Sequence, residues 1–176
     1  MKSIQLIFCV ETNKKSDTDF KYLLSAVRQF YQIGSHVRID RVYMDGRGNY
    51  CVPKVEKQIR TLVNQFQASN RDNVSYAIYC FDCDKYDVKP EDRQFLSEAS
   101  QYCAKDKFRR FVWFCRDVED VFLGKQIDDK QKTREANHFQ VRKMIQSFDF
   151  EKLTAKEYKP HYSNLCLVLD EFLERK

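Results

Sequence analysis

The chain has 176 residues, of which 43% are apolar and 14% aromatic. That composition excludes a disordered chain, and the length suffices to bury one hydrophobic core, so we expect a single domain over residues 1–176. The net charge of +5 permits a polyanionic partner without requiring one. No stretch approaches the roughly 18 apolar residues of a membrane-spanning helix, so we expect a soluble protein with no membrane partner.

Cysteine usage indicates a reducing compartment. The seven cysteines are odd in number and lie mostly inside apolar runs. Cys80 and Cys83 form a C-x-x-C pair, but the alternation of a strand would direct their side chains to opposite sides. We therefore expect free thiols in a cytoplasmic protein and no zinc site or disulfide.

The first half of the chain alternates strand and helix patterns. Residues 4–10 are an apolar run that predicts a buried strand, and apolar residues then recur at intervals of three and four over about 18–33, which predicts a helix. A second strand at 37–44 leads into a glycine-dependent turn at 45–49. Pro53 then opens a second helical pattern.

The stretch 74–84, VSYAIYCFDCD, is an apolar run that ends in two aspartates one residue apart. A third helix is marked by apolar residues over 95–103, and 111–115, FVWFC, predicts a fourth strand. If extended geometry persists to Asp84, the side chains of Asp82 and Asp84 project to the same side.

The last third of the chain contains no clear strand. Residues 124–135 are a charged stretch, 139–148 carry a helical period, and apolar residues over 165–173 mark a closing amphipathic helix. The whole pattern predicts an α/β fold: a Rossmann-like sheet of about four mainly parallel strands flanked by helices, with a helical C-terminal third.

Each predicted strand ends in an acid: Glu11, Asp45, the Asp82 and Asp84 pair, and Asp117 with Glu119. The carboxyl ends of parallel strands meet at the edge of the sheet where ligands bind. Like charges gathered there repel one another unless a cation neutralises them, which favours a metal site. An alternative is that the acids stabilise the N-termini of the helices that follow.

Three segments in this order resemble the Toprim domain: FCVE at 8–11, YMDGRGN at 43–49 and FDCD at 81–84. The chain looks most similar to the stand-alone RloB-like group and to the nuclease domain of the OLD group. The resemblance covers 4–125 and leaves 126–176 as a helical C-terminal extension. Thr12 replaces the glycine that usually follows the Toprim glutamate, and the chain has no phosphate-binding loop of the G-x-x-x-x-G-K-[ST] type. Any ATPase would therefore be a separate partner.

The resemblance implies a divalent-metal-dependent nuclease that hydrolyses phosphodiester bonds of DNA or RNA, as in bacterial phage-defence or restriction-associated systems. By this resemblance Glu11, Asp82 and Asp84 are catalytic and bind one Mg²⁺ or Mn²⁺. Glu119, with Asp17 or Asp120, would bind a second ion.

Basic residues that follow the predicted strands would bind the nucleic acid, with Tyr86 and His138 as stacking or proton-transfer groups. These basic residues are Lys14, Lys15, Arg47, Lys85, Arg116 and Lys125. The alternative function is a non-catalytic Toprim-like module that binds nucleic acid or a partner ATPase. A phosphotransfer receiver also uses acids at such an edge, but the paired aspartates fit it poorly.

Overall fold

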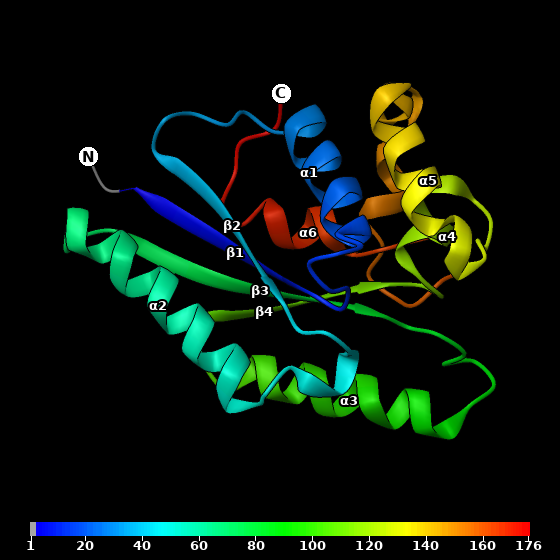
Figure 1. Ribbon diagram of the computed structural model, residues 1–176, viewed down its shortest axis with the longest axis horizontal. Coiled ribbons are helices and arrows are strands. Elements are labelled where there is room, and N and C mark those ends of the chain that lie inside the picture. Colours follow the sequence, from blue (N-terminus) through cyan, green and yellow to red (C-terminus); the bar gives the residue numbers. More distant parts are fainter. Residues whose placement is uncertain (1–2) are drawn as a thin grey trace.

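Four parallel strands form the centre of the protein in a computed structural model that describes residues 3–176 (Figure 1). The strands are β1 (Ile4–Val10), β2 (Val37–Tyr43), β3 (Val74–Asp82) and β4 (Arg109–Phe114), and they lie in the order β2-β1-β3-β4. Every neighbouring pair is parallel. The α/β class and the four-stranded sheet are confirmed, and the fold is Rossmann-like.

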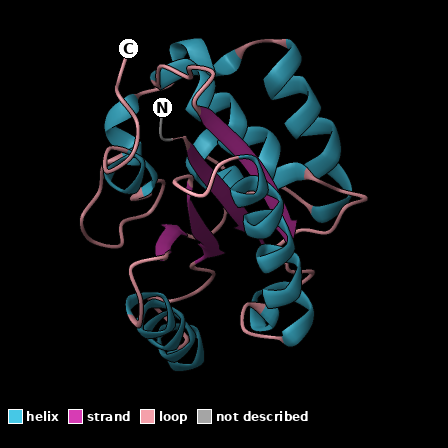
Figure 2. Cartoon of the chain, turned by 90° about the vertical axis from the view of Figure 1, so that its left-hand side faces the viewer, coloured by secondary structure: helices cyan, strands magenta, loops and turns pink. Residues whose placement is uncertain are grey.

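Helices cover both faces of this sheet (Figures 1 and 2). One face packs against α1 (Thr18–Phe30) and against helices that follow β4. The other face packs against α2 (Pro53–Ser69) and α3 (Pro90–Ala104). The helices after β4 are α4 (Val118–Leu123), α5 (Asp129–Val141) and α6 (Leu165–Leu169). Two short 3₁₀ segments, Met144–Ser147 and Phe150–Leu153, lie between α5 and α6, and a third, Arg47–Asn49, follows β2.

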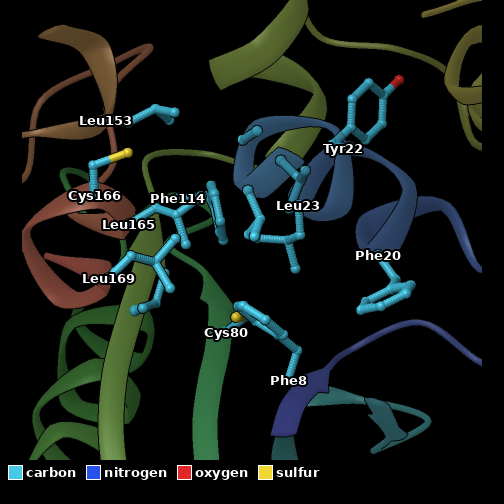
Figure 3. Close-up of a cluster of buried hydrophobic side chains, with 14 of the residues drawn as sticks. Phe8, Phe20, Tyr22, Leu23, Cys80, Phe114, Leu153, Leu165, Cys166 and Leu169 are labelled. Carbon is cyan, nitrogen blue, oxygen red and sulfur yellow. The ribbon is translucent and has the colours of Figure 1, made fainter. Parts of the chain in front are cut away.

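Alternation along the central strands builds two cores. In β1, Phe8 faces the α1 side and Cys9 faces the α2 side, and both are fully buried. The same alternation directs Cys80 and Cys83 into different cores, which confirms that they lie on opposite sides of the sheet. The core on the α1 side joins strand residues to the C-terminal segment, as Figure 3 shows for Phe8, Phe20, Tyr22, Leu23, Cys80, Phe114, Leu153, Leu165, Cys166 and Leu169.

The C-terminal third departs most from expectation. The charged stretch 124–135 contains the start of α5, and the period expected over 139–148 is broken because Lys143 adopts a left-handed conformation with φ 51°. Of the side chains of α5, Ala136 and Phe139 are buried, so the helix leaves little apolar periodicity in the sequence. The closing helix α6 spans five residues, and Leu173 packs into the core after it.

The seven cysteines are free thiols, and all except Cys51 are buried. In residues 3–176 no helix combines the length and the apolar character needed to cross a membrane.

Truncation of a strand residue should test the core on the α1 side. Phe8 is fully buried with its ring centroid 6.3 Å from that of Phe20, so Phe8→Ala should lower the free energy of unfolding by about 3–5 kcal/mol. Urea denaturation followed by circular dichroism measures this loss. The control is Val141→Ala, because Val141 is 78% exposed and its truncation should change the free energy by less than about 0.5 kcal/mol. Equal losses in the two variants would contradict this packing.

Candidate functional site

The ends of the two central strands meet at the carboxyl edge of the sheet. Glu11 follows β1, Asp82 ends β3, and Glu11 Oε1 accepts a hydrogen bond of 2.9 Å from the backbone N–H of Asp82. Asp82 Oδ1 in turn accepts a bond of 3.1 Å from the backbone N–H of Val118, the first residue of α4. The chain also switches here from α1 on one face of the sheet to α2 on the other, and such switch points are where open α/β sheets bind ligands.

Two buried acids stand beside this pair. Asp19, in the first turn of α1, is 6% exposed and accepts a bond of 3.3 Å from the backbone N–H of Thr12. Glu119, in the first turn of α4, is 1% exposed. Its Oε2 lies 3.2 Å from Lys132 Nζ, while its Oε1 has no hydrogen-bond partner in residues 3–176. We refer to Glu11, Asp19, Asp82 and Glu119 as the acid cluster.

The surroundings of the acid cluster raise the pKa values of its carboxyl groups, chiefly because these groups are buried. Burial raises the pKa of Glu11 to about 8, and the charges of Asp19 and Asp84 add to this, against the hydrogen bond from Asp82. Burial likewise raises the pKa of Asp19 to about 6 and that of Glu119 to about 7. For Asp82, burial and then the charge of Glu11 raise the pKa well above its ordinary value. A bound cation would relieve this repulsion.

The Asp84 carboxylate pairs with Arg47 and not with the acid cluster, which corrects the expectation that it projects to the same side as Asp82. Extended geometry ends at Asp82, and Asp84 adopts a left-handed conformation with φ 47°. Its Oδ2 is 2.6 Å from a guanidinium nitrogen of Arg47, whose other terminal nitrogen donates to Asp92 Oδ1 at 2.7 Å. The turn therefore directs Asp84 toward Arg47 and the start of α3.

The Asp17 carboxylate is also directed away from the acid cluster. Asp19 occupies the position that the sequence suggested for Asp17. Asp17 Oδ1 accepts a bond of 2.8 Å from Tyr43 Oη, and Oδ2 lies 3.1 Å from Arg41. Asp17 precedes α1 in a left-handed conformation, whereas Asp19 lies within the first helical turn. Side chains of a helix tilt toward its N-terminus, which brings the Asp19 carboxylate back to the sheet edge.

The donor chemistry of the acid cluster fits a hard divalent cation, because its ligands are carboxylate oxygens and Glu119 Oε1 is buried without a partner. In the described residues no group of three or more His, Cys, Asp and Glu side chains is placed to hold one metal ion. The prediction that Glu11, Asp82 and Asp84 converge on one ion is therefore not met in this structure.

Comparisons of the chain with protein-family models, with curated proteins and with solved structures find no match.

Of the predicted basic residues, Arg47 lies in the site through its pairs with Asp84 and Asp92. The others lie in the segments after β1, β3 and β4: Lys14, Lys15, Lys85 and Lys125 are exposed, and Arg116 is half-buried. Tyr86 packs against Tyr158, with ring centroids 5.4 Å apart, and His138 is exposed on α5.

Four residues in or near the site were missed by the sequence reasoning: Asp19, Asp92, Lys132 and His161. Lys132 sits in a charged stretch with no sign of its position in space, and Asp92 looks like an ordinary acid at the start of a helix. His161 reaches the edge because Ser163 forms an antiparallel bridge with Phe114; His161 Nδ1 lies 3.0 Å from Asp120 Oδ2. Only Asp19 left a signal in the sequence, because it is an acid in the first turn of the helix after β1.

The acid cluster should make stability depend on pH in metal-free buffer. Unfolded carboxyl groups titrate near pH 4, whereas Asp19, Glu119 and Glu11 have pKa values of about 6, 7 and 8 in the folded chain. Between these limits the folded state binds more protons than the unfolded state. The contribution of these groups to the free energy of unfolding is therefore complete at low pH and is lost as the pH rises.

The melting temperature in EDTA should therefore fall between about pH 5 and about pH 8, and Glu11→Gln should reduce that fall. The exposed Glu157→Gln serves as the control and should follow the wild type. A melting temperature that rises or stays constant over this range would contradict the raised pKa values.

Proposed function

We propose that the chain is a Toprim-like, divalent-metal-dependent nuclease that hydrolyses phosphodiester bonds of DNA or RNA. The observation that carries this proposal is the contact between Glu11 and Asp82 at the ends of adjacent central strands, with Asp19 and Glu119 beside them. Acids at a switch point between parallel strands combine a ligand-binding position with the charge that a metal ion requires.

Glu11 and Asp82 would hold Mg²⁺ or Mn²⁺, and Glu119, which has an unpartnered oxygen, would join them only after the side chains move, because no three of the described acids are placed to hold one ion. Asp84 is available as a ligand only after it leaves Arg47. A bound ion of this kind polarises a phosphoryl oxygen and lowers the pKa of bound water.

The chain's own groups supply proton transfer and charge. Glu11, whose carboxylate contacts the backbone of Asp82 at this edge, is the candidate general base for the water that the ion would bind. Arg47 presents a guanidinium at the same edge, and released from Asp84 it could bind a phosphate oxygen in the fork geometry that arginine favours. Lys132 neutralises part of the charge of Glu119.

One observation favours the alternative, a non-catalytic module that binds nucleic acid or a separate ATPase. Arg47 forms ion pairs with both Asp84 and Asp92. One of the two aspartates of the FDCD segment is therefore paired with an arginine and is not part of the acid cluster. In an enzyme these ion pairs would open when substrate or a partner binds. A phage-defence role with a partner ATPase belongs to the same proposal.

The purified protein should cleave a DNA or RNA substrate in the presence of Mn²⁺, and Asp82→Asn should lower the rate by at least about 100-fold because it removes a metal-binding charge. The control is Asp45→Asn, since Asp45 is an exposed aspartate at the same edge and its change should leave the rate within about twofold. Plasmid, single-stranded DNA and RNA are assayed with and without an ATPase encoded nearby. Absence of cleavage under all these conditions, or full activity in Asp82→Asn, would contradict the nuclease and leave the non-catalytic module.

A further inference from the structure

A groove runs between the edge strand β2 and helix α2. It has a volume of about 490 Å³ and an apolar floor that includes Val42 and Leu62. Its remaining lining residues are Arg41, Lys54, Lys57, Gln58, Thr61 and Gln65. None of these residues belongs to the acid cluster, so the groove is a separate feature of the surface.

The strand wall of the groove offers free main-chain groups. β2 lies at the end of the strand order and pairs with β1 alone. The bond from the N–H of Met44 to the carbonyl of Val10 shows that even-numbered residues of β2 face β1. Because successive residues of a strand direct their N–H and C=O groups to opposite sides, those of Ile39 and Arg41 face outward. No other strand of residues 3–176 pairs with this edge.

The helix wall of the groove is positive. Lys54 and Lys57 are exposed on α2, and the exposed Gln58, Thr61 and Gln65 continue the stripe at helical spacing. The groove is lined by no acidic residue. A partner with negative side chains would therefore be favoured there, and a basic partner would be rejected.

We propose that this groove binds an acidic, extended peptide segment of a partner protein, which adds to the sheet as a fifth strand beside β2. Main-chain hydrogen bonds to Ile39 and Arg41 supply affinity in this mode, and alternate side chains supply specificity. Apolar side chains of the peptide contact Val42 and Leu62, and its acids pair with Lys54 and Lys57.

A peptide fits this groove better than a nucleic-acid strand for two reasons. The exposed strand edge presents carbonyl oxygens as well as N–H groups, and carbonyl oxygens accept bonds from peptide amides but have no attraction for phosphates. The apolar floor suits aliphatic side chains, whereas single-stranded nucleic acid is bound by aromatic stacking platforms, and no aromatic residue lines the groove.

The probe is a fluorescein-labelled peptide of repeated Thr-Val-Thr-Glu, which places valine and glutamate on the same side of an extended chain, tested against the full chain by fluorescence anisotropy. We expect saturable binding, and at least about a tenfold loss of affinity in the double variant Lys54→Glu/Lys57→Glu. The matched control is Lys105→Glu/Lys107→Glu, which reverses two exposed lysines in the loop between α3 and β4 and should leave affinity unchanged. Circular dichroism and melting temperature establish that both variants fold.

Hydrogen exchange separates strand addition from simple charge attraction. Exchange of the amides of Ile39 and Arg41 should slow when the peptide binds, and a peptide with proline at alternate positions should bind far more weakly because proline has no N–H to donate. The proposal is overturned if the acidic peptide fails to saturate below roughly 1 mM, if the two double variants lose affinity equally, or if those amides are not protected. It is also overturned if a single-stranded oligonucleotide, and not the peptide, competes for Lys54 and Lys57.

Discussion

A hydrogen bond between neighbouring strand ends holds the acid cluster in place. The backbone N–H of Asp82 donates to Glu11, so the glutamate is fixed by the register of β1 against β3 and not by a flexible loop. Asp82 is fixed in the same way by the N–H of Val118 at the start of α4. Because both anchors are backbone groups, the carboxylates keep their places despite mutual repulsion, and the large cores on both faces of the sheet offset the cost of holding them together.

The strands and their common edge could be predicted because burial on both faces leaves continuous apolar runs, as in residues 4–10 and 74–82. Three helices between strands were equally visible through their apolar spacing. The closing helix predicted over 165–173 is present as the shorter α6. Helix α5 was not visible, since it buries Ala136 and Phe139 alone among its side chains. Its contribution to the site, through Lys132, depends on tertiary packing that leaves no local pattern.

Glu11 and Asp82 were found from the sequence because strand ends are simple to locate. Side-chain direction beyond a strand end depends on a single backbone torsion, and here the sequence reasoning failed. The left-handed conformation of Asp84 turns its carboxylate to Arg47, and that of Asp17 turns it to Tyr43. Asp19 belongs to the cluster because it lies two residues later, in the first turn of α1. The FCVE and FDCD segments thus end at one edge of the sheet, but their sequence does not specify where every carboxylate points.

If the acid cluster binds a divalent cation, anomalous diffraction from crystals grown with Mn²⁺ should locate the ion. A manganese peak is expected at the carboxyl edge, within about 2–2.5 Å of carboxylate oxygens of Glu11 and Asp82. Absence of a peak there, or peaks confined to exposed acids such as Asp129, whose side chain is 97% exposed, would show that the acid cluster does not bind the ion.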